Sequence, residues 1–239
     1  MYNYENSKAN IINILKSKTP TEITNTIPTD QEFTFENGIK CMVSAIFVDI
    51  VDSSTLFKSK DEKLARLLRA FTSEVITILQ DFVQYNQIGI RGDCVYGIYS
   101  TPSNTDIDKV FNIAVYVNTF MKMFNELLSN NGYQQIKVGI GLGCDEELII
   151  KAGRSGTGIN DKIWIGKAVV DAANLSSIAN RDGYKSIAMS EEFYSKIIDW
   201  ENNEKSWFNK TSNSVTKSIF YQCDVIKTKF NKWIKDGMK

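Results

Sequence analysis

The chain has 239 residues, of which 43% are apolar, and it carries 28 Lys plus Arg against 28 Asp plus Glu. This length and composition indicate one globular domain with extensions, and the balanced charge gives no reason to expect nucleic acid or an anionic membrane as a partner. The sequence contains no His, which excludes His-dependent catalytic triads and imidazole metal sites. Phosphate chemistry that uses carboxylates and a hard metal ion remains open.

The first 39 residues are polar, with a candidate helix at 9–15 and two prolines that separate it from the body of the chain. We expect an N-terminal extension at 1–39, a central domain at 40–199 and a C-terminal extension at 200–239 that contains a closing strand. No stretch reaches the roughly 20 apolar residues of a membrane span, and the N-terminus lacks a signal-peptide core. The sequence therefore predicts a cytoplasmic protein with no membrane partner.

The segment 42–51 is an almost unbroken apolar run rich in Ile and Val, which predicts a strand covered on both faces. Asp49 lies inside this run. Because a buried carboxylate is costly to desolvate, we expect Asp49 to have a metal ion, a positive partner or several hydrogen-bond donors; the alternative is a cap for the next turn. The polar turn at 52–55, with Ser53 and Ser54, either points N–H groups at phosphates or simply opens the next helix.

The segment 87–100 predicts two short strands joined at Arg91-Gly92-Asp93, because Gly-Asp flanked by Ile, Val and Tyr favours a hairpin. If this hairpin lies beside the strand at 42–51, then Asp49 and Asp93 converge. Two carboxylates that face one cavity suit Mg²⁺ or Mn²⁺, with the phosphates of a substrate completing the coordination shell.

The remaining apolar spacing predicts helices at 61–82, 106–128 and 191–198 and strands at 135–143, 147–152, 186–189 and 218–226. The Gly-rich segment 153–158 lacks the phosphate-loop and dinucleotide spacings, so we expect a connector there. The four cysteines are far apart and form no Cys-x-x-Cys pair, which favours free thiols. The order of the elements is typical of a ferredoxin-like α+β fold, an antiparallel sheet with helices packed on it.

Four motifs in order resemble the class III nucleotidyl cyclases, over roughly residues 40–190. They are Phe47-Val48-Asp49-Ile50 with its polar loop, Gly92-Asp93, the strand Val138-Gly139-Ile140-Gly141-Leu142-Gly143, and the helical segment 166–179. The resemblance implies the class III catalytic fold and two Mn²⁺ or Mg²⁺ ions per site. Their ligands would be Asp49, the Ile50 carbonyl and Asp93. It also implies a head-to-tail homodimer, in which Asp49 and Asp93 of one chain share a site with Asn174 of the other.

The chain departs from the purine-cyclase pattern at four matching positions. Gly89 and Ile163 stand where that pattern has its two base-selecting residues, Lys and Asp. Val170 stands at the ribose-contacting Asn and Asn174 at the transition-state Arg. This combination resembles the pyrimidine cyclases of bacterial anti-phage signalling (Pycsar-type), and among them the uridylate cyclases. It implies conversion of UTP to 3′,5′-cyclic UMP, a second messenger, and pyrophosphate.

Two residues are candidate base contacts, Phe47 and Arg91, each two positions before a predicted metal ligand. Phe47 would pack on the base or ribose, and Arg91 would donate to a pyrimidine carbonyl; a core position and a salt bridge are the respective alternatives. Uracil presents a carbonyl where cytosine has an amine, so an Arg donor favours UTP over CTP. A cytidylate or purine cyclase, or an inactive nucleotide-binding homologue, are the alternative functions. Retention of both Asp residues favours an enzyme, because two desolvated carboxylates repel each other without a cation.

Overall fold

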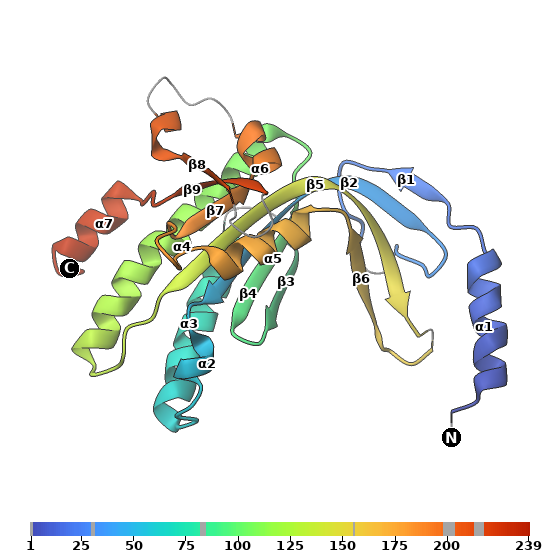
Figure 1. The fold of residues 1–239 in the computed structure, drawn as a ribbon, viewed down its shortest axis with the longest axis horizontal. Coiled ribbons are helices and arrows are strands. Elements are labelled where there is room, and N and C mark those ends of the chain that lie inside the picture. The colour runs from blue at the N-terminus through green and yellow to red at the C-terminus, as the bar shows by residue number, and fades with distance from the viewer. Residues whose placement is uncertain (1, 30–31, 82–84, 155, 198–203, 213–217) are drawn as a thin grey trace.

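Two long strands form the spine of the molecule (Figure 1). The computed structural model describes residues 2–29, 32–81, 85–154, 156–197, 204–212 and 218–239. Strand β2 (Gly38–Ile50) runs antiparallel to β5 (Val138–Gly153) along its whole length, from Gly38 opposite Ile150 to Ile50 opposite Val138. The other strands attach to this pair or to one another beside it.

The sheet has a wide end and a narrow arm. At the wide end its order is β3-β4-β2-β5-β7-β9-β8, in which only β5 and β7 pair in parallel. The strands added here are β3 (Tyr85–Arg91), β4 (Cys94–Ser100), β7 (Ile187–Ser190), β8 (Asn209–Ser212) and β9 (Ile219–Cys223). In the arm, β1 (Thr21–Ile23) pairs in parallel with the start of β2, and β6 (Asn160–Ile165) pairs antiparallel with the end of β5.

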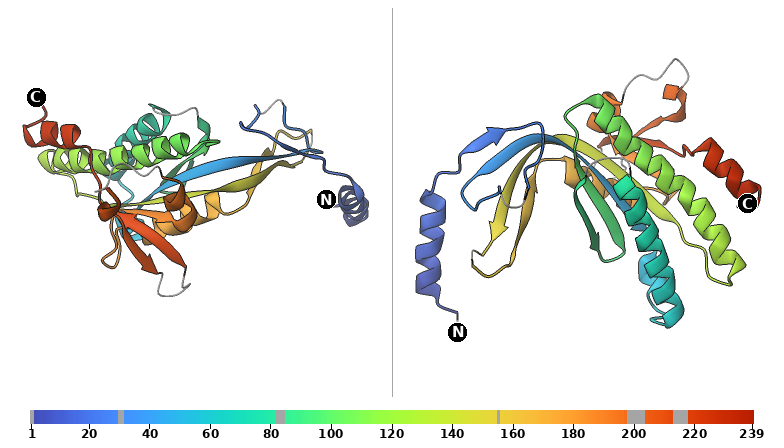
Figure 2. Two further views of the ribbon diagram at one scale, coloured as in Figure 1. Left: turned by 90° about the horizontal axis from the view of Figure 1, so that it is seen from above. Right: turned by 180° about the vertical axis from the view of Figure 1, so that it is seen from behind.

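Helices cover both faces of the wide end. Helices α3 (Glu62–Asp81), α4 (Asn104–Asn130) and α6 (Glu191–Lys196) pack on one face, and α5 (Ala168–Ile178) lies along β5 on the other (Figure 2). The remaining helical segments are α1 (Tyr4–Lys16), α2 (Ser53–Leu56), the single 3₁₀ turn Glu204–Trp207, and α7 (Thr228–Lys235), which packs against α4. None of the helices within the described ranges is long and apolar enough to cross a membrane.

The alternation of side chains along β2 decides which residues face α5. Ile46, Val48 and Ile50 belong to the core beneath α3 and α4, whereas Ala45 and Phe47 belong to the cluster on the α5 side. Because successive side chains in a strand point to opposite faces, Asp49 shares the α5 face with Phe47. The apolar strand of the sequence thus carries its one carboxylate toward α5.

The two long helices follow from apolar spacing and a cap. The buried residues of α3 are Leu64, Leu67, Phe71, Val75 and Leu79, spaced by threes and fours as predicted. Helix α4 begins with a capping box, in which the Ser103 hydroxyl accepts from the Asp106 N–H and the Asp106 carboxylate accepts from the Ser103 N–H. Helices α3 and α4 therefore confirm the predicted helices at 61–82 and 106–128. Phe82, the predicted end of the first, and Ile198, the predicted end of the helix at 191–198, lie outside the described residues.

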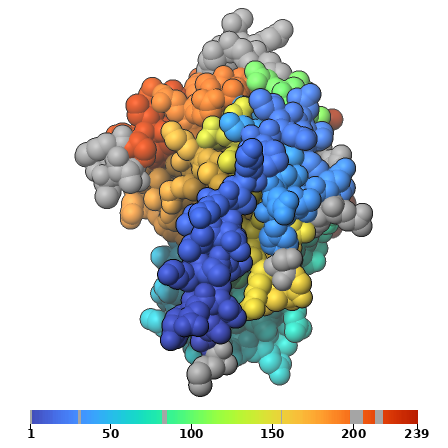
Figure 3. Space-filling view, turned by 90° about the vertical axis from the view of Figure 1, so that its right-hand side faces the viewer, coloured from blue at the N-terminus to red at the C-terminus, as the bar shows by residue number. Residues whose placement is uncertain are grey.

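The N-terminal helix stands apart from the core. None of the residues of α1 is buried, and the helix lies at the outer end of the molecule, beyond the arm (Figures 1 and 3). The chain then joins the sheet through β1, while Ile27 and Phe33 are buried on the α5 face. The division into extensions and a central domain remains a prediction, and its second boundary, between residues 199 and 200, lies outside the described residues.

The sequence was wrong about the strands at 135–143 and 147–152, because β5 runs unbroken through both. Two acidic residues near the predicted break have partners: Asp145 Oδ2 accepts from the Lys167 N–H at 2.9 Å and Glu147 Oε1 from the Ala168 N–H at 2.8 Å. A strand can hold such residues when they cap an adjacent helix. The sequence also gave no sign of β6, β8 or α7, whereas the hairpin at 87–100 and the closing strand are confirmed as β3–β4 and β9.

Candidate functional site

The structure brings the two predicted metal carboxylates together. Asp49 is the last residue but one of β2, and Asp93 follows the hairpin bend at Gly92, whose φ of 65° suits glycine. Burial raises the pKa of Asp49 above its usual value, and the negative charge of Asp93 raises it further, while Arg181 opposes both effects. Because β4 pairs with β2 and Val95 lies opposite Val48, Asp93 lies close enough for its charge to act on Asp49, and the predicted convergence is found.

The oxygens at this point fit a hard divalent ion. Oδ2 of Asp93 is buried and has no hydrogen-bond partner in the structure, although a buried anionic oxygen normally requires one. Within the described ranges, no three Asp, Glu or Cys side chains are arranged to hold an ion. The two carboxylates and the Ile50 carbonyl would therefore share the shell with water or phosphate oxygens, as Mg²⁺ sites commonly do.

The neighbouring thiol does not add a soft ligand. Burial, followed by the charge of Asp49, raises the pKa of Cys94 to about 12, so the thiol is protonated at neutral pH and is a poor metal ligand. All four cysteines are free, as the sequence predicted.

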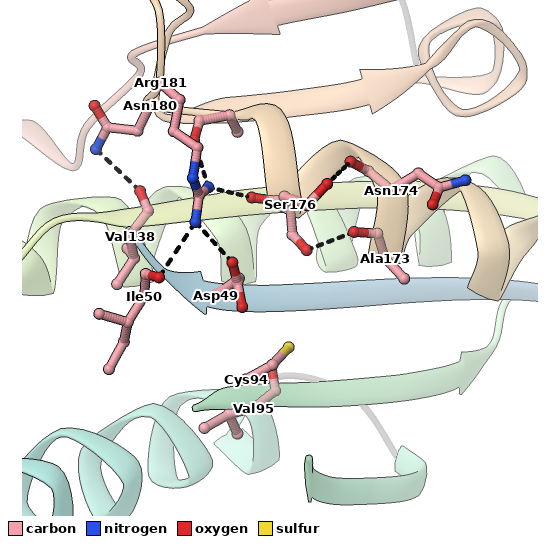
Figure 4. A network of polar contacts seen from close by, with 12 residues as sticks. Asp49, Ile50, Cys94, Val95, Val138, Ala173, Asn174, Ser176, Asn180 and Arg181 are labelled. Carbon is pink, nitrogen blue, oxygen red and sulfur yellow. Dashed lines mark hydrogen bonds and ion pairs between the residues drawn. The ribbon is translucent and has the colours of Figure 1, made fainter. Parts of the chain in front are cut away.

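A residue that sequence reasoning missed, Arg181, occupies the centre of the site (Figure 4). Its Nη2 donates to Asp49 Oδ2 at 2.8 Å and to the Ile50 carbonyl at 3.2 Å. The side chains of this ion pair are only 21% and 23% exposed, Arg181 and Asp49 respectively. One guanidinium nitrogen thus contacts two of the three groups that the resemblance implies as metal ligands.

The same guanidinium also caps the C-terminal end of α5. Nη1 donates to the carbonyls of Ser176 at 2.9 Å and Ala179 at 3.1 Å, where a positive charge is favourable because helix carbonyls are unpaired at that end. The loop is fixed to β5 by Asn180, which has a φ of 59° and donates from Nδ2 to the Val138 carbonyl at 3.0 Å. Arg181 is one of five arginines in the sequence, and no motif around it signals its position.

Helix α5 lies directly on the backbone of β5. A Cβ at Gly139, Gly141 or Gly143 would come within 2.2, 2.0 and 2.3 Å of the carbonyl oxygens of Ser176, Ala172 and Ala168, respectively. The alternating glycines therefore form a groove that only glycine permits. Gly139 is also the residue paired with Asp49 across the sheet, so the groove brings the end of α5 beside the carboxylates.

The two α5 positions that match the purine-cyclase contacts face outward. Val170 and Asn174 are both exposed and four residues apart, on the side of the helix opposite the buried Ala168, Ala172 and Leu175. Figure 4 shows the Asn174 side chain pointing away from Asp49. The structure of one chain therefore does not bring Asn174 to the carboxylates of that chain.

Phe47 and Gly89 belong to one wall on the α5 face. Phe47 stacks on Tyr96, with ring centroids 5.1 Å apart and an angle of 14° between the planes. Tyr96 in turn covers Gly89, where a Cβ would lie 2.5 Å from the phenol oxygen. The space over Gly89, where purine cyclases have a base-selecting Lys, is therefore filled by the Tyr96 ring.

Two further side chains hold Tyr96 in place. Gln87 donates from Nε2 to the Tyr96 hydroxyl at 3.2 Å, and the Trp164 indole N–H donates to Gln87 Oε1 at 3.1 Å. Trp164 lies on β6 next to Ile163, the second position that lacks a purine selector. Sequence reasoning missed this chain of contacts because Trp164 lies 77 residues after Gln87.

The other predicted contacts lie around the edge of this site. Arg91 is exposed at the end of β3, beside the bend that carries Asp93. Ser53 and Ser54 begin the four-residue helix α2, with Ser53 partly buried and Ser54 exposed. The preceding residue, Asp52, has a φ of 56° and turns the chain sharply after β2.

Glu147 fixes the other end of α5 and is fully buried. Its Oε1 accepts from the Ala168 N–H, whereas Oε2 is buried without a hydrogen-bond partner. Burial is the largest effect on this carboxyl and raises its pKa, although the hydrogen bond from Ala168 opposes the rise. Gly166 leaves room for it, since a Cβ there would lie 2.6 Å from the carboxyl carbon.

This buried carboxyl should make stability depend on pH. Because the folded pKa is raised above the ordinary 4.5, wild type keeps its full stability below that pH and loses up to about 1.4 kcal/mol per pH unit as the pH rises through the folded value. Glu147→Gln lacks this loss. We expect the free energy of unfolding of Glu147→Gln, measured with urea at pH 4.5, 6 and 8, to rise relative to that of wild type as the pH increases. A difference that is constant, or that falls with pH, would contradict the raised pKa.

Comparison with known proteins gives two close relatives. The chain is 43% identical over 238 residues to a uridylate cyclase of Treponema porcinum, an alignment that covers 99% of this chain and 82% of the relative. It is 28% identical to a uridylate cyclase of Gulbenkiania mobilis, covering 99% and 97%. Among solved structures, the adenylyl cyclase CyaB from P. aeruginosa is similar in fold, with a TM-score of 0.63 at 18% identity over 78% of this chain and 95% of that one. No family model matches the sequence.

Proposed function

Because the chain belongs to the uridylate cyclase family of class III nucleotidyl cyclases, we propose that it converts UTP to 3′,5′-cyclic UMP and pyrophosphate. The observation that carries this proposal is the 43% identity to a uridylate cyclase along 99% of the chain. The family and its cyclase activity agree with the resemblance carried by the four sequence motifs.

The reaction changes the charge on two groups, the ribose 3′-hydroxyl and the departing pyrophosphate, and the residues of the site would stabilise both changes. The ribose 3′-hydroxyl passes its proton to water and its oxygen attacks the α-phosphorus, while the bond from that phosphorus to the pyrophosphate oxygen breaks and pyrophosphate leaves with the electron pair. We assign Asp49, the Ile50 carbonyl and Asp93 as ligands of two Mn²⁺ or Mg²⁺ ions. Such ions, when bound, supply activation of the hydroxyl and neutralisation of the phosphate charge. Ser53 and Ser54, which begin α2 just after β2, would bind the phosphates through their N–H groups and hydroxyls.

The wall around Tyr96 supports the preference for a pyrimidine. Tyr96 occupies the space over Gly89 into which a purine-reading Lys would project, and Gln87 and Trp164 hold it there. A larger ring meets this fixed wall, and the binding energy of a purine falls accordingly. Phe47, stacked on Tyr96, offers its ring to the base or ribose, and Arg91 at the hairpin end donates to a carbonyl of uracil.

The outward position of Asn174 supports a site shared between two chains. In a head-to-tail homodimer, two-fold symmetry creates two equivalent sites, each with Asp49 and Asp93 from one chain and Asn174 from the other. The Asn174 amide would donate a hydrogen bond to the phosphate in the transition state. It replaces only part of the role of an arginine, because it carries no charge.

Incubation with single nucleotides tests the substrate. Purified protein with Mn²⁺ and each of UTP, CTP, ATP and GTP should yield cyclic UMP as the main product, with cyclic CMP next, as identified by mass spectrometry. A parallel preparation of Asp93→Ala controls for a contaminating cyclase. Cyclic AMP or cyclic GMP as the main product would reject the pyrimidine assignment, and no cyclic product from any nucleotide would favour a domain that only binds nucleotides.

The resemblance to Pycsar-type cyclases supports a role in anti-phage defence, in which cyclic UMP acts as a second messenger. Nucleotide extracts of cells that express the chain, taken before and during phage infection, test this role. We expect cyclic UMP to rise on infection and to stay absent with Asp93→Ala. An unchanged level in an active enzyme would reject the defence role without affecting the chemistry.

A further inference from the structure

Arg181 occupies the place beside Asp49 and the Ile50 carbonyl where the resemblance implies a metal ion. Nη2 donates to Asp49 Oδ2 and to the Ile50 carbonyl at the same time, at 2.8 and 3.2 Å. An oxygen whose lone pairs accept from a guanidinium cannot use the same lone pairs for an ion, and two like charges cannot share the space between two oxygens. The guanidinium and the ion are therefore competitors for one position.

The charges at the site explain why the protein would keep a cation there. The negative charge of Asp93 acts unfavourably on the charged form of Asp49, and Arg181 is the positive group that offsets this effect. Both members of the Arg181–Asp49 pair are about four-fifths buried, so solvent screens the pair poorly. Without Arg181, the metal-free chain would hold two neighbouring carboxylates with no cation bonded to Asp49.

The rest of the guanidinium has a place that does not depend on Asp49. Nη1 is bonded to the carbonyls of Ser176 and Ala179 at the end of α5, an environment that attracts a positive charge in its own right. Loss of the Nη2 contacts would leave these bonds available, so the side chain has a second, already formed set of acceptors.

We propose that Arg181 is an internal counter-cation, which occupies the ion position between Asp49 and the Ile50 carbonyl and is displaced when a divalent ion binds there. The inference rests on the metal assignment of the proposed function and adds a positioning residue to it. Arg181 keeps the ligands in place in the metal-free chain and lowers their affinity for the ion. Metal binding is then an exchange of one cation for another.

Metal affinity tests the exchange without reference to catalysis. Binding of Mn²⁺ alone is measured by the electron paramagnetic resonance signal of the free ion, for wild type, Arg181→Met and Lys185→Met. The Lys185 variant is the matched control, because it removes the same charge from the same loop. We expect Arg181→Met to bind Mn²⁺ about tenfold more tightly or better, and Lys185→Met to differ from wild type by less than about twofold. Equal or weaker binding by Arg181→Met would overturn the proposal.

A second measurement uses the unmodified side chain, in case Arg181→Met does not fold. The ¹⁵Nε–H signal of Arg181, assigned by its loss in Arg181→Lys, should shift and exchange faster with solvent when Mg²⁺ saturates the protein. A signal that Mg²⁺ leaves unchanged would overturn the displacement. Asp49→Ala distinguishes a failure of the metal assignment from a failure of the exchange. If this variant binds Mn²⁺ as well as wild type does, the proposed metal site itself fails, whatever the behaviour of Arg181.

Discussion

Asp49→Ala and Asp93→Ala are each expected to reduce cyclase activity by about a thousandfold or more, with Mn²⁺ or Mg²⁺ at saturating concentration. Each change removes a carboxylate from the proposed metal site, whose ions would stabilise the charge that develops on the phosphate oxygens. A thousandfold loss corresponds to about 4 kcal/mol of transition-state stabilisation, which is within the several kcal/mol that such ions contribute. The rate of cyclic UMP formation from UTP measures it.

The control for this prediction is a carboxylate of no expected role, Glu126, which is exposed on α4. Glu126→Ala should keep wild-type activity, and circular dichroism should show the same fold for all three variants. Asp49→Ala also deprives Arg181 of its partner, so its thermal stability has to be compared with that of wild type. Full activity in either Asp variant would rule out the proposed metal ligands.

Restored activity in a mixed dimer is the second large effect that we expect. Asp49→Ala and Asn174→Ala chains are each expected to be inactive as homodimers. Co-expressed with different affinity tags and purified as heterodimers, they should recover about half of the wild-type activity, because one of the two sites then has all its residues. The outward position of Asn174 on α5 is the structural reason, since it places the amide away from Asp49 of its own chain.

The controls are the two homodimers, purified in the same way through both tags. A heterodimer of proven composition that stays inactive would show that the site lies within one chain or that Asn174 acts elsewhere. If Asn174→Ala homodimers keep wild-type activity, the amide has no part in the transition state, and the assignment made by resemblance fails for that residue.

The sequence predicted the parts of the site that reside in one short segment. Asp49 could be recognised because a carboxylate is conspicuous in an apolar strand, and Asp93 because Gly-Asp marks a hairpin bend. The pairing of these segments was only a hypothesis until β4 was found beside β2. The helices at 61–82 and 106–128 were predictable for a similar reason, since apolar spacing is a local property of the sequence.

What the sequence did not reveal depends on contacts between distant segments. Arg181 lies 132 residues after Asp49, and Tyr96, Gln87 and Trp164 meet from three separate strands. The break predicted within β5, at residues 144–146, contains Asp145, whose hydrogen-bond partner, the Lys167 N–H, lies 22 residues further along the chain. Local patterns carry no information about such partners.

The groove of Gly139, Gly141 and Gly143 limits how this enzyme can change. Since carbonyl oxygens of α5 lie where the missing side chains would be, the height of the helix above the sheet is set by main-chain atoms and cannot be adjusted by exchanging one apolar residue for another. New substrate preferences are therefore accessible through the exposed positions of α5, such as Val170 and Asn174, and hardly through the layer beneath them. A library that randomises the outer face of α5 should yield folded variants often, whereas one that randomises the three glycines should yield almost none.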